Sequence, residues 1–278
     1  MNFLIAVILG LVQGVTEFLP ISSSGHLAVL QNVFNVQDIG ADHTLFSVLL
    51  HLATLVSVCI VYWDDIKGMV LEGIGFIRDI GHPKPDEGGV KPQRRLLFMI
   101  IIGILPLVIV LPFKSSIESL SSSTMFIGIA FLITGFMLLL SDKMQNGRKN
   151  EKDMSVKDAL VVGVCQAVAV LPGISRSGAT ITSGMAVGFN RTFAVKFSFL
   201  MSLPAIIGAN LLELIDVIGN GVDWAMVPMY LVGMVVAGVT GYFAIRLVKM
   251  LSQKGKFGKF CYYCFAAGIV TIVLTIIY

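Results

Sequence analysis

Long apolar runs dominate this chain and restrict what it can fold into. Six of them approach or exceed the roughly 20 residues that a helix needs to cross a hydrocarbon core: 44–63, 96–113, 124–141, 193–215, 226–245 and 260–278. Hydrophobic residues make up 56% of the 278 residues and charged residues only 13%, where a soluble globular chain carries about 25%. The sequence therefore predicts an all-α integral membrane protein, with 1–278 forming a single membrane domain.

Two further regions, 1–30 and 158–190, are apolar at both ends but interrupted in the middle. Pro20 and the serines that follow break the first, and Pro172-Gly173 breaks the second. Such a break is tolerated at membrane depth only where protein or a water-filled cavity satisfies the freed backbone groups. Each region is predicted to form two half-helices that meet at a polar tip. The alternatives are a single crossing by 1–30, or ordinary kinks in tilted helices.

The two interruptions repeat one another at a constant offset. Six pairs of identical residues stand 153 positions apart: Gly10/Gly163, Gln13/Gln166, Ile21/Ile174, Ser22/Ser175, Ser24/Ser177 and Gly25/Gly178. The first copy adds Glu17 and His26, and the second adds Arg176. Polar and ionisable groups are costly at membrane depth and usually mark function there. A register that holds through the whole motif favours a duplicated structural unit over chance kinks.

Basic residues set the expected orientation, because short cytoplasmic loops are enriched in Lys and Arg. They cluster in three loops, 64–95, 142–157 and 246–259. The other three loops are 31–43, 114–123 and 216–225, and Lys114 is the only Lys or Arg in them. These three loops are therefore expected to face outside. The net charge of +3 is small, and nothing in its distribution indicates a nucleic-acid partner.

Threading the chain through these loops predicts an inverted-topology repeat. The segment 158–190 must enter and leave on the cytoplasmic side, and 1–30 is expected to do so on the external side. The halves 1–141 and 158–278 then each hold one re-entrant hairpin and three spanning helices, six spanning helices in all. Functional sites in such folds lie where the broken hairpins meet near the midplane.

The first interruption carries an acid beside an amide. Gln13 and Glu17 are four residues apart, which places them on one face of a helix. Such a pair can hold a hydrated divalent cation, accept a proton or orient water. The plainer alternative is a glutamate that is hydrogen-bonded within the bundle.

A hydroxyl-rich turn follows: Ser22, Ser23, Ser24, Gly25 and then His26. The N–H groups at the start of a helix favour anions, and the hydroxyls add further donors. The histidine could act as a base toward a serine or could itself attack phosphorus. It could also be a hydrogen-bonded core residue, and His43 and His51, which lack such neighbours, are expected to be structural or interfacial.

The second interruption supplies a permanent cation, Arg176. Its planar guanidinium suits bidentate phosphate binding. Its neighbours are two glycines and three hydroxyl residues: Gly173, Ser175, Ser177, Gly178 and Thr180. An ion pair with Glu17 would explain the charges but not the hydroxyls. Phosphate is therefore the ligand inferred from the residues, and a phosphorylated lipid is the substrate class, although a carrier for an organic anion would use the same parts.

The first motif reads Gln13-Gly-Val-Thr-Glu17-Phe-Leu-Pro20-Ile-Ser22-Ser-Ser24-Gly25-His26, and the second reads Pro172-Gly-Ile-Ser175-Arg176-Ser177-Gly-Ala-Thr180. Both resemble the motifs of the undecaprenyl-diphosphatase family, also called the bacitracin-resistance protein family. The resemblance implies a multi-pass enzyme of the bacterial inner membrane. It would hydrolyse undecaprenyl diphosphate to undecaprenyl phosphate and inorganic phosphate on the external, periplasmic side, recycling the lipid carrier for peptidoglycan synthesis. It also implies bacitracin resistance and dependence on Mg²⁺ or Ca²⁺.

The resemblance also implies roles for individual residues. Glu17 would be the essential acid and would hold the metal, Arg176 would clamp the diphosphate, and Ser23 or His26 would attack phosphorus. Ser23 assisted by His26 is favoured, with direct attack by water left open. The remaining residues of the two motifs are expected to bind substrate: Gln13, Ser22, Ser24, Gly25, Gly173, Ser175, Ser177, Gly178 and Thr180. Many members have Glu at the position of Gln13, which weakens any scheme with two carboxylates on the metal.

Two matters remain open from the sequence. The alternative function is a polyprenyl-phosphate flippase or an organic-anion transporter built on the same inverted repeat. A homodimer is also left open.

Overall fold

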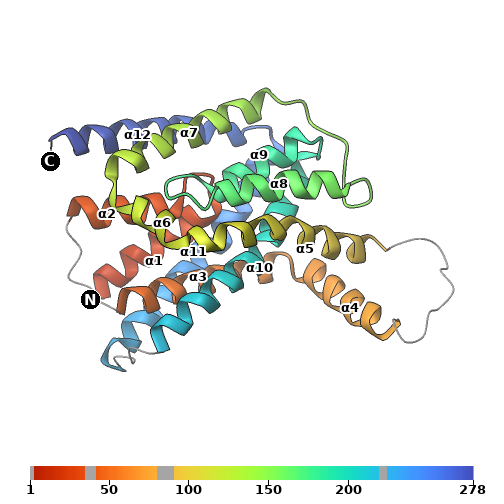
Figure 1. Ribbon diagram of the computed structural model, residues 1–278, viewed down its shortest axis with the longest axis horizontal. Helices are drawn as coiled ribbons and strands as arrows, with labels where there is room; N and C mark the ends of the chain where they lie inside the picture. The colour runs from red at the N-terminus through yellow and green to blue at the C-terminus, as the bar shows by residue number, and fades with distance from the viewer. Residues whose placement is uncertain (1–2, 35–41, 80–90, 219–223, 278) are drawn as a thin grey trace.

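The computed structural model describes residues 3–34, 42–79, 91–218 and 224–277, and this part of the chain is helical (Figure 1). The helices are α1 (Phe3–Phe18), α2 (Ser23–Phe34), α3 (Asp42–Val61), α4 (Trp63–Asp79), α5 (Pro92–Val110), α6 (Lys114–Ser119), α7 (Thr124–Lys143), α8 (Val156–Val168), α9 (Arg176–Ala186), α10 (Arg191–Ile218), α11 (Val227–Gln253) and α12 (Phe260–Ile277). Within the described residues, β pairing is limited to one isolated bridge between Lys149 and Phe189.

The predicted apolar runs are all helices. Among the described residues, five helical segments are long and apolar enough to cross a membrane: Pro92–Ser122, Thr124–Lys143, Arg191–Leu214, Trp224–Gln253 and Phe257–Ile277. The sixth run corresponds to α3, which passes the same test only together with α4, from which it is bent by 89°. The all-α integral membrane architecture is therefore confirmed.

Helix α4 is an addition to the predicted architecture, because it lies in the segment 64–95 that was expected to be a loop. It packs beside α5 at the edge of the bundle (Figure 1). Trp63, Val70, Ile74 and Ile77 are exposed along it, while Met69 is buried. Charged residues between these positions hide the helical pattern from a search for continuous apolar runs.

Both predicted interruptions are breaks between helices. The first separates α1 from α2 and the second separates α8 from α9. Each new helix begins in the same way: the Ser22 hydroxyl accepts from the Gly25 N–H at 3.3 Å, and the Ser175 hydroxyl accepts from the Gly178 N–H at 3.1 Å. The capping serine satisfies one of the amide donors that a helix start leaves without a partner.

The two halves also pack in matching ways. Helix α1 lies against α11, and α8 lies against α5. At the first contact Gly10 meets Gly233, and at the second Gly163 meets Gly103, so closely that an added Cβ would stand 2.5 Å and 2.2 Å from the facing carbonyl oxygens. Small residues let helices approach to this extent in membrane proteins.

A two-fold axis relating residues 1–141 to residues 158–278 would produce these two matching helix contacts. The opposite orientation of 1–141 and 158–278 in the membrane stays a prediction. Three of the expected loops lie partly outside the described residues: the external loops 31–43 and 216–225 and the cytoplasmic loop 64–95. The side chain of His43 also lies outside them.

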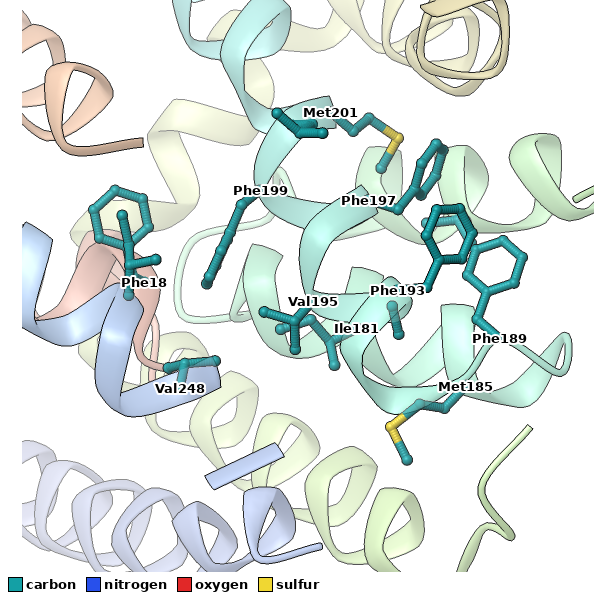
Figure 2. Close-up of a cluster of buried hydrophobic side chains, with 14 of the residues drawn as sticks. Phe18, Ile181, Met185, Phe189, Phe193, Val195, Phe197, Phe199, Met201 and Val248 are labelled. Atoms are coloured by element: carbon teal, nitrogen blue, oxygen red, sulfur yellow. The ribbon is translucent and has the colours of Figure 1, made fainter. Parts of the chain in front are cut away.

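A buried apolar cluster holds the hairpins against the long helices. In Figure 2 the rings of Phe18, the last residue of α1, and Phe199 of α10 lie edge to face, with their centroids 5.4 Å apart. Ile181 of α9 lies next to Val195 of α10 in the same cluster. Because Phe18 directly follows Glu17, this packing also fixes where the acid is placed.

Candidate functional site

The tips of the two hairpins are in direct contact. An added Cβ at Gly25 would stand 2.9 Å from the Gly173 Cα, and one at Gly178 would stand 3.4 Å from the Pro20 Cβ. The Ser177 hydroxyl donates to the Leu19 carbonyl oxygen at 3.3 Å. Glycine is therefore needed at Gly25 for the close approach of the two turns. The residues of both motifs form one site at this junction.

Glu17 is the centre of the junction. Its Oε2 accepts hydrogen bonds from the Ser23 hydroxyl at 2.7 Å and from the Gln13 amide Nε2 at 3.0 Å. Its Oε1 accepts from Nη2 of Arg176, which comes from the other hairpin. The Glu17 side chain is only 3% exposed and that of Arg176 is 27% exposed. The buried carboxylate is thus neutralised by a cation whose own side chain is partly exposed.

Ser23 is the first residue of α2, and the residue before it has its backbone in the left-handed region. The preceding residue, Ser22, has a φ of 70°, which a residue other than glycine adopts only at a cost of about 1–3 kcal/mol when its surroundings enforce it. Ser23 is partly exposed and Ser24 is exposed. The site therefore presents hydroxyl donors next to the helix start, where anions bind favourably.

His26 does not contact Ser23 through any hydrogen bond of the described structure. Its Nδ1 lies 2.6 Å from the Ser22 carbonyl oxygen and its Nε2 lies 2.7 Å from the Tyr263 hydroxyl. The expected assistance of Ser23 by His26 therefore has no direct geometric counterpart. The group positioned to accept the Ser23 proton is Glu17.

The hydroxyls around Arg176 hold the second tip together. Ser175 caps α9, and its N–H donates to the Thr134 hydroxyl at 3.1 Å. The Thr180 hydroxyl donates to the Arg176 carbonyl oxygen at 2.9 Å and lies 2.5 Å from the Ser198 hydroxyl. Ser175, Ser177 and Thr180, all predicted to bind substrate, are buried. Their hydrogen bonds place them as supports for the turn that carries Arg176.

Two residues at the site were not predicted from the sequence. His51 of α3, expected to be structural or interfacial, places its Nε2 3.8 Å from Oε2 of Glu17, while its Nδ1 donates to the Ser47 carbonyl oxygen at 2.8 Å. Tyr263 of α12 reaches His26. His51 lies in the helix that follows α2 and Tyr263 lies in α12, and neither is part of a motif, so only the fold brings them here.

The donor set of the junction suits a hard cation shared with a phosphorylated ligand. Within the described residues, no group of three or more His, Cys, Asp or Glu side chains could hold a metal by itself. However, Oε1 of Gln13 is buried without a hydrogen-bond partner, and this amide lies directly beside the Glu17 carboxylate. Mg²⁺ typically takes one or two carboxylates and completes its oxygen shell with water and substrate phosphates.

Comparisons with known proteins identify relatives that match this chain over nearly its whole length. Residues 6–270 match the family described as "Bacitracin resistance protein BacA". The chain is 41% identical over 277 residues to the undecaprenyl-diphosphatase of Alkaliphilus metalliredigens, with 98% of each chain covered. It is 39% identical over 282 residues to the undecaprenyl-diphosphatase of Methanosphaera stadtmanae, covering 100% of this chain and 99% of that one. The enzyme of the same name from Halothermothrix orenii is 38% identical over 273 residues, covering 98% of both.

Proposed function

The chain belongs to the family of the bacitracin resistance protein BacA, and from this membership and the junction of the two tips we propose that it is an undecaprenyl-diphosphate phosphatase. Its substrate is undecaprenyl diphosphate, and its products are undecaprenyl phosphate and inorganic phosphate. One observation carries the proposal: the hydroxyl of Ser23 from one hairpin and the guanidinium of Arg176 from the other bind the same buried carboxylate of Glu17.

In the proposed reaction Ser23 is the nucleophile. Its Oγ attacks the terminal phosphorus, Glu17 takes the hydroxyl proton, and the bond from that phosphorus to the bridging oxygen breaks. Undecaprenyl phosphate leaves, and water then hydrolyses the seryl phosphate to release inorganic phosphate. A serine is a weak nucleophile until an adjacent base activates it, and the 2.7 Å hydrogen bond to Glu17 supplies that base.

Arg176 stabilises the charge that develops on the phosphoryl oxygens. In the free protein its Nη2 is bound to Glu17, and the remaining exposure of its side chain leaves the guanidinium accessible to the diphosphate. As Arg176 turns toward phosphate, its positive charge moves from the carboxylate to the phosphoryl oxygens. The N-terminal end of α2, where Ser23 stands, adds the positive partial charge of the helix dipole to the site.

Glu17 and Gln13 are the residues that would hold Mg²⁺ or Ca²⁺. Bound there, the cation would neutralise part of the diphosphate charge. Two observations support this assignment: the Glu17 carboxylate lies beside the Gln13 amide, and the buried Oε1 of that amide has no hydrogen-bond partner among the described residues.

The site is proposed to open on the external, periplasmic face of the bacterial inner membrane, where the enzyme recycles the lipid carrier for peptidoglycan synthesis and confers resistance to bacitracin. The distribution of basic loops supports this orientation. Single cysteines at Glu118 and Arg148, introduced after the four native cysteines are replaced, test it. External labelling is expected at position 118 and not at position 148, and the reverse pattern would overturn the orientation.

The activity is tested by phosphate release from undecaprenyl diphosphate in detergent with divalent cation. The wild type is expected to release phosphate, and folded Glu17→Gln and Arg176→Ala variants are expected to be severely impaired. No release by the wild type, or full activity in both variants, would defeat the proposal. Lipid movement across vesicles without phosphate release would instead identify a flippase.

A further inference from the structure

The environment of His26 is built by two helices outside the motifs. Its ring is stacked on Tyr263 of α12, with centroids 5.6 Å apart and planes at 15°, and it meets Phe131 of α7 edge on at 5.0 Å. Helices α7 and α12 pack against each other. The imidazole is thus held in a slot whose walls are fixed by the bundle.

Hydrogen bonds fix the protons of this imidazole. The carbonyl oxygen of Ser22 can only accept, so the Nδ1 that lies 2.6 Å from it carries a proton. In the neutral ring Nε2 is then the acceptor, and the Tyr263 hydroxyl at 2.7 Å donates to it. Both nitrogens are occupied, and Nε2 is directed at α12. This geometry leaves His26 poorly placed to attack phosphorus.

The same hydrogen bonds connect Tyr263 to the nucleophile. The Ser22 carbonyl that His26 binds belongs to the residue with a φ of 70°, and the next residue is Ser23, whose hydroxyl is bound to Glu17. A left-handed backbone at a serine persists only when its surroundings hold it. The clamp from Tyr263 through His26 to the Ser22 carbonyl supplies such a restraint one residue before Ser23.

We propose that Tyr263 is a positioning residue for the reaction. Its hydroxyl holds His26 in the Nδ1–H tautomer, and His26 in turn holds the Ser22 backbone in the conformation that places the Ser23 hydroxyl on Glu17. This proposal rests on the proposed phosphatase function, in which Ser23 is the nucleophile. Tyr263 itself does not contact the reacting atoms.

The kinetic test uses Tyr263→Phe, which keeps the stacked ring and removes only the hydroxyl. Its matched control is Tyr262→Phe, the neighbouring tyrosine, which is 71% exposed. Tyr263→Phe is expected to lower kcat about tenfold, the upper end of the net contribution of one hydrogen bond, with KM for undecaprenyl diphosphate nearly unchanged. The control should match the wild type. An unchanged kcat in Tyr263→Phe, or an equal loss in both variants, would overturn the proposal.

A rescue experiment separates positioning from a merely structural role. Glycine adopts positive φ without strain, so Ser22→Gly should reduce the need for the clamp. In the Ser22→Gly background, adding Tyr263→Phe is expected to lower kcat less than about threefold, against about tenfold in the wild-type background. A loss of equal size in both backgrounds would contradict positioning through the Ser22 backbone.

A spectroscopic test does not depend on activity. In protein labelled with ¹⁵N-histidine, the His26 resonances, assigned by their loss in His26→Gln, should show a protonated Nδ1 and an unprotonated, hydrogen-bonded Nε2. Tyr263→Phe should shift the Nε2 resonance, and Tyr262→Phe should not. The opposite tautomer in the wild type would overturn the clamp even if phosphate release is normal. A wild type that shows the clamp but releases no phosphate would refute the phosphatase instead.

Discussion

The pairing of Ser23 with Glu17 leads to a prediction about how their substitutions combine. Glu17→Gln keeps the shape of the side chain, and its amide oxygen can still accept from Ser23 Oγ. It cannot take the proton. General-base catalysis by a positioned side chain contributes about 10²–10⁴-fold to a rate, so kcat is expected to fall by about that factor.

Ser23→Ala removes the nucleophile and should lower kcat by at least as much. Because the two residues act as one unit, the double variant is expected to be about as active as Ser23→Ala alone. Two independent contributions would instead multiply, giving a loss of about 10⁴–10⁸-fold. The predicted and the alternative outcomes therefore differ by at least about 10² in rate.

The assay is quenched single-turnover formation of phosphate with the enzyme in saturating excess over undecaprenyl diphosphate, which isolates the chemical steps from product release. Each variant is first checked for folding, because breaking a buried ion pair costs about 3–5 kcal/mol, less here since Arg176 is partly exposed. Thr16→Val serves as a control, because that hydroxyl donates to the Val12 carbonyl one helical turn back. A multiplicative loss in the double variant, or substantial activity in Ser23→Ala, would refute the reasoning.

Three further predictions concern packing, pH and metal. Gly163→Ala forces a Cβ to 2.2 Å from the Gly103 carbonyl oxygen and should cost about 1–3 kcal/mol, seen as a lower Tm, whereas Gly208→Ala, with nothing within 4 Å, should not lower Tm. Burial raises the pKa of Asp158, but hydrogen bonds from the Ser155 N–H and the Lys149 ammonium outweigh it and hold the pKa below its ordinary value of 3.8. The carboxylate therefore stabilises the fold above that value, and the Tm difference between wild type and Asp158→Asn should narrow as the pH falls through the folded pKa; a constant difference would contradict this. Chelation by EDTA should abolish phosphate release, and added Mg²⁺ or Ca²⁺ should restore it; undiminished activity after chelation would remove the cation from the proposal.

The long helices and both helix breaks were predictable because each leaves a local signal. An apolar run of sufficient length leaves few alternatives to a helix in a membrane, and Pro20 and Gly173 interrupt such runs within a few residues. The amphipathic α4 was missed because Asp64, Asp65 and Lys67 interrupt the continuous apolar run in the sequence. Its stability depends on packing beside α5, which no local pattern reports.

The site was predictable in its residues and less so in its contacts. Sequence proximity suggested that His26 assists Ser23, yet His26 is bound to Tyr263 and Ser23 is bound to Glu17. His51 has no motif around it and reaches Glu17 only through the placement of α3. Partners supplied by distant helices depend on tertiary packing, for which one sequence carries no direct signal.

The most direct test of Ser23 as the nucleophile is chemical trapping of the phosphorylated enzyme. Rapid quenching in SDS at neutral pH during turnover of undecaprenyl diphosphate preserves both phosphoserine and phosphohistidine, and peptide mass spectrometry should then find one phosphoryl group on Ser23. The group should be absent in Ser23→Ala and reduced in Arg176→Ala. A phosphoryl group on His26, or oxygen transfer from labelled water to phosphate in a single step without any phosphorylated enzyme, would contradict the mechanism.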